Sequence, residues 1–210
     1  MSKRPLDWLI WGGLTLTIAG IAVAFVASEL RKSRPAPLPV ITQGLPAFSL
    51  TNQLGEKVTP EAFSNVVSVV DVIFTRCAGP CPEMTRRMGE LQRVIPPSLP
   101  VRLVTVTTDP EHDTPAVLQQ YARQRNADPK RWWFLSGAKS DIAQLAREGL
   151  KLVAQETRPE DRVNDADLFI HSTVFVVLDK RGRLRGSFES TEPDFNARIR
   201  RAVRELAREK

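Results

Sequence analysis

The chain has 210 residues, a formal net charge of +6 and only two cysteines. This length supports one ordinary domain with a hydrophobic core of its own, so the fold does not depend on cysteine cross-links. The excess positive charge lies beside an apolar N-terminal segment and in residues 194–210, and no basic stripe carries interleaved aromatic residues. The composition therefore excludes a nucleic-acid partner.

The N-terminal segment WLIWGGLTLTIAGIAVAFVA (8–27) contains no charged residue. A helix of this length, at about 1.5 Å per residue, matches a hydrocarbon core of ~30 Å, and Trp8 and Trp11 suit the membrane interface. The segment predicts a single transmembrane helix that is retained. The alternative is a signal peptide, with a small-residue cleavage site near Ala22.

A proline-rich segment follows the apolar one. SRPAPLPVITQGLPAF (33–48) has four prolines and little periodicity, which is typical of an extended tether. We therefore expect a membrane anchor at residues 1–32, a tether at 33–44 and a globular domain at 45–210.

The patterns in the globular part alternate between strands and helices. VVSVVDVIF (66–74) is a nearly continuous β-branched run, typical of a strand buried on both faces, and Asp71 is its one charged interruption. PEMTRRMGELQRVI (82–95) predicts a helix whose buried side includes Met84 and Met88. Further strands are expected at 101–108, at 131–137 and in a hairpin at 171–190, and further helices at 116–125 and 194–210. Residues 48–63 predict two short strands and a helical turn, and residues 141–153 predict a helix followed by a strand. This order predicts an α/β fold with a mixed central sheet flanked by helices.

The two cysteines, Cys77 and Cys81, lie between the buried strand and the next helix. A disulfide closing so short a loop would stabilise the fold little. Pro82 favours a first helical turn there, which places Cys81 near a helix N-terminus, where the dipole and free amide groups favour the thiolate. Nearby arginines are expected to add positive charge. Two alternatives follow: a dithiol that exchanges with a partner, or a pair of metal ligands.

A metal site would need further ligands, and the chain's only histidines are His112 and His171. Two thiolates with one imidazole under-supply a closed zinc site but suit copper, above all Cu(I). His112 lies among acidic residues in the loop before a helix, so we expect it to be solvated or to belong to the capping region of that helix. Asp113 beside it is the candidate N-cap of that helix.

Three stretches form a specific combination: FTRCAGPCPEM (74–84), VTTDPEHDTPAVLQQYA (106–122) and IHSTVFVVLDKRGRLRG (170–186). In this order they resemble the Sco (SenC) family of membrane-anchored, thioredoxin-like copper proteins, over most of residues 45–205. The resemblance implies a thioredoxin-like fold, with Cys77, Cys81 and His171 as ligands of Cu(I) or Cu(II).

The resemblance also implies a role in building the copper centre of cytochrome c oxidase. The recipient would be an oxidase subunit or another copper protein, and a copper donor or a thiol reductant would be a further partner. The soluble domain would lie outside the cytoplasmic (inner) membrane, on the periplasmic side.

Two positions depart from the family's pattern. The residues between the cysteines, 78–80, include no acidic side chain, and Ile170 stands where an Asp commonly precedes the histidine. Fewer carboxylates are then available to orient the imidazole, which bears on copper affinity and Cu(II) preference more than on ligand identity. Gly79 and Pro80 also resemble the thioredoxin loop. A membrane-anchored thiol–disulfide reductase is therefore the alternative function, and a peroxidase of the same fold is a third.

Overall fold

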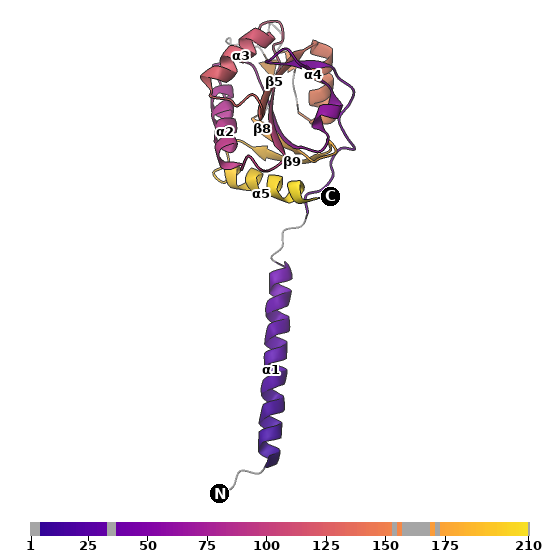
Figure 1. The fold of residues 1–210 in the computed structure, drawn as a ribbon, viewed down its shortest axis with the longest axis vertical. Coiled ribbons are helices and arrows are strands. Elements are labelled where there is room, and N and C mark those ends of the chain that lie inside the picture. The colour runs from indigo at the N-terminus through magenta and orange to yellow at the C-terminus, as the bar shows by residue number, and fades with distance from the viewer. Residues whose placement is uncertain (1–4, 33–36, 153–154, 157–168, 171–172, 210) are drawn as a thin grey trace. The chain divides into compact units, whose positions relative to one another are not determined.

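The computed structural model describes residues 5–32, 37–152, 155–156, 169–170 and 173–209. The chain divides into two compact units, residues 1–37 and 38–210. The first contains α1 (Pro5–Lys32), and the stretch Trp11–Ser28 within it is long and apolar enough to cross a membrane. A helix therefore forms where the sequence predicts the membrane anchor (Figure 1).

The second unit is built on a seven-stranded mixed sheet with the strand order β2-β1-β5-β4-β3-β8-β9. The three central strands run parallel to one another, and β1 and β8 pair antiparallel with their outer sides. A separate two-stranded sheet joins β6 to β7. The strands are β1 (Leu50–Asn52), β2 (Lys57–Val58), β3 (Val67–Ile73), β4 (Val101–Thr107), β5 (Trp132–Gly137), β6 (Gln155–Glu156), β7 (Phe169–Ile170), β8 (Val174–Leu178) and β9 (Leu184–Glu189).

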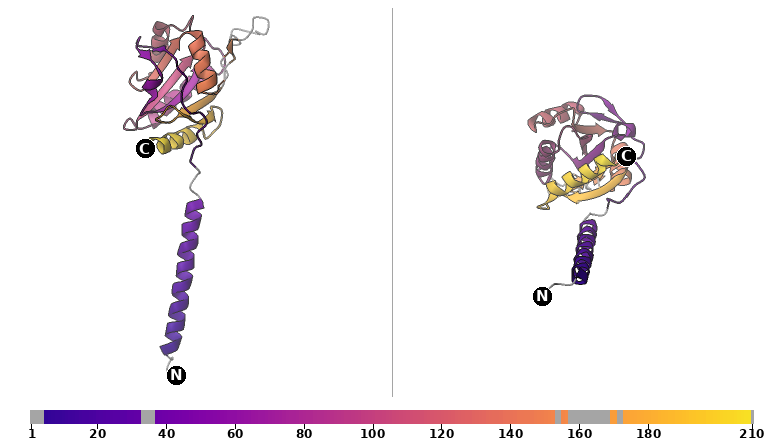
Figure 2. Two further views of the ribbon diagram at one scale, coloured as in Figure 1. Left: turned by 90° about the vertical axis from the view of Figure 1, so that its right-hand side faces the viewer. Right: turned by 60° about the horizontal axis from the view of Figure 1, so that its bottom comes forward.

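Helices cover both faces of this sheet (Figures 1 and 2). One hydrophobic cluster packs α2, α3 and α5 against one face, and the other packs α4 and the two short helical turns against the opposite face. All seven residues of β3 are buried, as its β-branched run predicts. The helical elements are η1 (Pro60–Phe63), α2 (Cys81–Val94), α3 (Pro115–Gln124), α4 (Lys139–Gln144), the π-helical turn η2 (Leu145–Gly149) and α5 (Phe195–Arg208).

The core contains the large side chains that the sequence patterns place inside. Met84 and Met88 are fully buried, so these thioethers pack in the core. Trp132 is also fully buried; its ring stacks on Phe134 with centroids 4.9 Å apart, and its indole N–H donates to Thr105 Oγ1 at 2.9 Å. Buried polar atoms of this kind need a partner, and here β4 supplies it.

Part of the proline-rich segment, from Leu38 onward, belongs to the second unit and packs along β9. The backbone N–H of Ile41 donates to Leu184 O at 2.8 Å, and Leu184 N–H donates to Thr42 Oγ1 at 3.0 Å. Arg185, which is 4% exposed, donates to the carbonyl oxygen of Leu38 at 2.6 Å. The chain is thus attached to β9 from Leu38 onward.

Candidate functional site

The cysteine loop, residues 74–80, joins the end of β3 to the start of α2. The N–H of Cys77 donates to Phe74 O at 3.3 Å, and Gly79 N–H donates to the Cys77 sulfur at 3.3 Å. Cys77 is 6% exposed and Cys81 is fully buried, and both stand as thiols rather than as a disulfide. The exposed residues Ala78 and Gly79 leave the loop open to solvent on the side of Cys77.

Cys81 is the first residue of α2, as Pro82 predicts, but the expected preference for the thiolate is wrong for this thiol. The pKa of Cys81 is raised above its ordinary value, chiefly because its side chain shares a hydrogen bond with Cys77 and is buried. The charge of Asp71 raises the pKa further, and a backbone hydrogen bond with Phe74 opposes these effects. The hydrogen bond with Cys77 and the burial of the sulfur therefore outweigh the effect expected from the helix N-terminus.

The arginines near the loop do not supply the expected charge to the sulfurs. Arg76 forms an ion pair of 2.7 Å with Asp109, and Arg86 and Arg87 both pair with Glu83 of their own helix. Each guanidinium is held by a carboxylate. The sequence could not reveal this, because Asp109 lies on the loop after β4 and reaches Arg76 only in the folded sheet.

Asp113 fixes the cysteine loop to the loop that follows β4. Its carboxylate, which is fully buried, accepts from the backbone N–H of Thr75 at 3.0 Å and from the hydroxyls of Thr75 and Thr107. Asp113 is therefore not the N-cap that the sequence predicts. Thr114 caps α3 instead, with its hydroxyl accepting from Val117 N–H at 3.4 Å. Thr75 lies two residues before Cys77, so Asp113 holds the loop that carries this cysteine.

His112 is half exposed at the edge of the same cluster. Its Nδ1 lies 2.9 Å from Asp113 Oδ1 and 3.5 Å from Thr75 Oγ1. The expectation of a solvated histidine is therefore only partly right, because one ring nitrogen is tied to the carboxylate that holds the cysteine loop. The pattern Asp-Pro-x-x-Asp-Thr-Pro at residues 109–115 is the only sequence signal for this contact, and an aspartate at that position usually caps the following helix.

Asp71 is fully buried on β3, on the face that also bears Cys81 and α2. Thr105 Oγ1 donates to its Oδ1 at 2.7 Å, whereas Oδ2 has no hydrogen-bond partner among the described residues. Burial raises the pKa of this carboxyl to about 7. In the sequence Asp71 stands out only as a polar residue in a buried strand. The structure shows that it is a titratable group close enough to Cys81 for its charge to affect the pKa of that thiol.

The hydroxyls of α2 and α3 extend this polar cluster. Thr85 Oγ1 donates to Cys81 O at 2.9 Å and lies 2.9 Å from the hydroxyl of Tyr121. The pKa of Tyr121 is raised, mainly by burial, with smaller contributions from the charges of Asp71 and Cys81. The first turn of α2 is therefore fixed both at its backbone and at its side chains.

The third predicted ligand, His171, lies outside the described residues. Within the described part of the chain, no three His, Cys, Asp or Glu residues lie close enough together to hold a metal ion. The donor chemistry still fits copper as cargo, because two neighbouring thiols are soft ligands of the kind that Cu(I) prefers. These residues supply two of the three predicted ligands.

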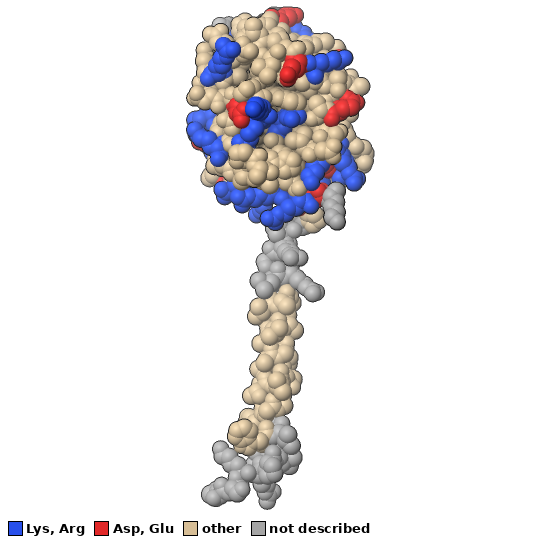
Figure 3. Space-filling model, in the orientation of Figure 1, with Lys and Arg blue, Asp and Glu red and all other residues tan. Residues whose placement is uncertain are grey.

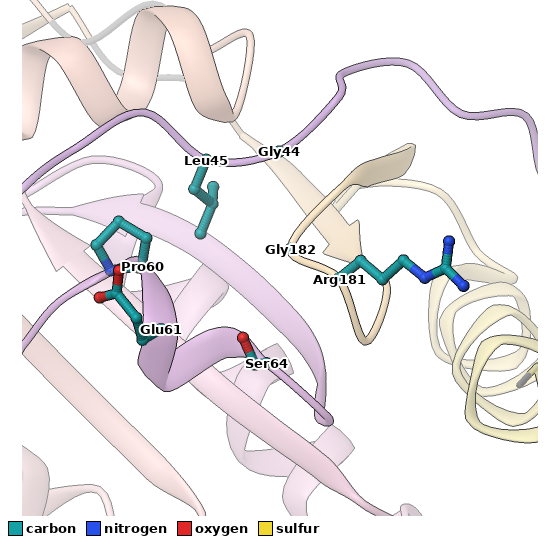
Figure 4. Close-up of a pocket in the computed structure, with 7 residues that line it drawn as sticks. All are labelled: Gly44, Leu45, Pro60, Glu61, Ser64, Arg181 and Gly182. Carbon is teal, nitrogen blue, oxygen red and sulfur yellow. The ribbon is translucent and has the colours of Figure 1, made fainter.

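A surface hollow of about 220 Å³ lies away from the cysteines, near the start of β3 (Figure 4). It is open to solvent and is bordered by the turn between β8 and β9 and by η1. Leu178, at the end of β8, is paired with Ser68 at the start of β3, so this turn lies at the opposite end of the strand from the cysteine loop. The hollow is therefore not part of the candidate site.

Comparisons with known proteins bear on this arrangement. The SCO1/SenC family model matches residues 42–208. The SCO1 protein homolog of Bacillus subtilis (strain 168) is 30% identical over 147 residues, which make up 69% of this chain and 73% of that protein.

Solved structures share the fold. The structure of BsSco, a member of the Sco family of cytochrome c oxidase assembly proteins in which a disulfide switch was identified, matches with a TM-score of 0.69 at 27% identity, over 83% of this chain and 100% of that one. Copper-bound ScoI of Bradyrhizobium japonicum matches with a TM-score of 0.58 at 22% identity, over 78% of this chain and 99% of that one.

The sheet order, the helices on both faces and these structural matches confirm the thioredoxin-like α/β fold. The family model extends over nearly the whole of the second unit, and the Bacillus subtilis relative matches the larger part of both chains. The chain therefore belongs to the SCO1/SenC family.

Proposed function

We propose that this protein binds a copper ion through Cys77, Cys81 and His171 and delivers it to a copper protein during assembly of a respiratory cytochrome c oxidase. The observation that carries the proposal is the pair of hydrogen-bonded thiols, one in the cysteine loop and one at the first residue of α2, with the loop open to solvent beside Cys77. Copper bound to ScoI of Bradyrhizobium japonicum, a protein that matches this chain in fold, supports the choice of metal.

The loop residues prepare the two sulfurs for a soft cation. Copper replaces the proton that Cys81 holds, because thiolates rather than thiols bind metals. The N–H of Gly79 donates to the Cys77 sulfur and stabilises its negative charge. Asp113 holds Thr75, so the segment carrying Cys77 keeps its position when the metal enters or leaves. The recipient then takes copper by exchanging its own ligands for these sulfurs.

The runner-up function is a thiol–disulfide reductase. The dithiol of Cys77 and Cys81 would be oxidised to a disulfide while a partner's disulfide is reduced to two thiols, so the two protons and two electrons pass to the partner. Asp71 favours this function, because its buried carboxyl has a pKa of about 7 and can therefore hold or release a proton at neutral pH.

We also propose that α1 holds the protein in the cytoplasmic (inner) membrane, with residues 38–210 on the extracytoplasmic side. The length and apolar composition of Trp11–Ser28 support the anchor. An oxidising compartment would also give the dithiol two accessible redox states, which couples copper loading to the supply of reductant.

Competition with a Cu(I) chelator tests the copper function, using the full chain in a non-ionic detergent under reducing conditions. Cys77→Ser, Cys81→Ser and His171→Ala should each weaken binding by at least about tenfold, because each removes one of three ligands. His112→Ala is the matched control, since it removes the other histidine, and should leave the affinity unchanged. Full affinity in His171→Ala would rule out the three-ligand site. Rapid disulfide exchange without copper binding would favour the reductase.

A further inference from the structure

One face of α5 is strongly basic. Its opposite face packs into the core, whereas Arg200, Arg201, Arg204 and Arg208 are exposed. At about 100° per residue these four side chains fall within an arc of about 100°, centred opposite the buried residues. Figure 3 shows Lys and Arg side chains gathered along this edge of the second unit.

The four arginines are not neutralised by neighbours. None of them forms an ion pair or a side-chain hydrogen bond with another residue in the described part of the chain, whereas Arg198 of the same helix pairs with Glu192. The arginines of α2 differ as well, since Arg86 and Arg87 both pair with Glu83. The face of α5 therefore presents a positive charge that no side chain among the described residues neutralises.

The segment that leads from the membrane anchor docks on this helix. The N–H of Leu38 donates to Glu205 Oε1 at 3.2 Å, and the carbonyl oxygen of Leu38 accepts from Arg185 at 2.6 Å. Arg185 is itself held by Glu209, at the C-terminal end of α5, through a contact of 2.6 Å. The chain therefore enters the second unit beside the C-terminal half of α5.

The covalent chain limits how far α5 can lie from the end of the anchor. Residues 33–37 join Lys32, the last residue of α1, to Leu38. Even fully extended, that length of chain spans at most about 20 Å. If Trp11–Ser28 crosses a bilayer, this linker limits how far Leu38, which contacts Glu205 of α5, can move from the membrane surface.

We propose that the basic face of α5 binds the surface of a bilayer that contains anionic lipids and thereby fixes the orientation of residues 38–210 on the membrane. Four arginines and the short linker of residues 33–37 match a surface of negative headgroups, whose attraction for each basic residue decays within a Debye length. The inference goes beyond copper binding and needs no copper.

This orientation has a consequence for the candidate site. The tether docks at Leu184, which pairs with Leu178, and Leu178 pairs in turn with Ser68 at the start of β3. The cysteine loop follows Ile73 at the other end of the same strand, about 17 Å further along at the usual rise per residue. Binding through α5 and the tether therefore holds Cys77 at the end of the sheet that lies away from the tether.

Arginine footprinting on the full chain tests the proposal. The protein is placed in nanodiscs of phosphatidylcholine alone or with one-third phosphatidylglycerol and treated with phenylglyoxal, and modification is quantified by mass spectrometry. The α5 arginines should react at least about threefold more slowly in the anionic discs, and about 0.5 M salt should abolish the difference. Arg147, exposed on η2, is the internal reference and should react equally in both discs.

Two variants sharpen the result. Arg200→Gln with Arg201→Gln should reduce the protection of Arg204 and Arg208, because half of the basic face is gone. Arg123→Gln with Arg125→Gln, which removes the same charge at the C-terminal end of α3, should leave the protection intact. Equal reaction rates of the α5 arginines in the two kinds of nanodisc would overturn the proposal. The basic face would then be a binding surface for an acidic protein instead. Failure of the chain to enter nanodiscs would also overturn it, while leaving the copper function untouched.

Discussion

Replacing Asp71 by Asn tests whether the buried carboxyl beneath the dithiol is protonated in the folded protein. In the folded state its pKa is about 7, against an ordinary value of 3.8. Between these two pH values the unfolded chain has released the proton and the folded chain still holds it. The folded state therefore binds more protons, and its stability falls as pH rises from about 4 to about 7.

The size of the effect follows from the two pKa values. At about 1.4 kcal/mol per pH unit, a pKa of about 7 in place of 3.8 costs the folded wild type about 4 kcal/mol by pH 8. Asn has the same shape but no charge. Its amide nitrogen would occupy the position of Oδ2, which lacks a partner among the described residues, at a cost of about 1–3 kcal/mol. We expect Asp71→Asn to be more stable than wild type by about 1–3 kcal/mol at pH 8.

Urea unfolding of the full chain in a non-ionic detergent, followed by circular dichroism from pH 4 to pH 8, measures this. The difference in unfolding free energy between Asp71→Asn and wild type should grow by about 4 kcal/mol over that range. Asp194→Asn, at an exposed position before α5, is the matched control and should show no such trend. A difference that stays constant with pH would refute the protonated buried carboxyl.

Three further predictions concern the loop, the metal and the core. Asp113→Ala removes the hydrogen-bond acceptor of Thr75 and Thr107, so we expect the free energy of unfolding to fall by about 3 kcal/mol. Cys77 should also react faster with iodoacetamide, because its loop is no longer held. An unchanged alkylation rate would mean that Asp113 does not hold the loop. Cu(I) binding at pH 7 should release at least one proton per copper, since the pKa of Cys81 is raised. Calorimetry in two buffers of different ionisation enthalpy measures the number of protons released, and a value of zero would contradict the prediction. Met88→Ala, in the fully buried core, should cost about 2–5 kcal/mol, measured by the melting temperature, with the exposed Val94→Ala as the control.

The cysteine loop shows which structural features can be predicted from the local sequence. The buried run before it and Pro82 after it were enough to predict a loop between β3 and α2 with Cys81 at the helix start. Local rules also predicted that the dipole would favour a thiolate. That prediction failed because the pKa of Cys81 depends on the distance to Cys77, the depth of burial and the charge of Asp71, and none of these is a local property.

The loop after β4 was misassigned for the same reason. Asp113 precedes a helix, where capping is its most common role, yet its carboxylate turns inward to Thr75 and Thr107 and leaves capping to Thr114. Sequence spacing gives no sign of this, because β3 and β4 become neighbours only when the parallel sheet forms.

The sequence by itself determined the order of strands and helices, the buried faces and the family motifs, because hydrophobic periodicity and turn chemistry act over a few residues. Only the tertiary structure decided which charged and hydrogen-bonding groups contact one another. It joins Arg76 to Asp109, places Asp71 on the face of the sheet that bears the dithiol, and docks Leu38 against α5. Electrostatic and hydrogen-bond partners are set by distances through space, and these exist only once strands far apart in the chain lie side by side.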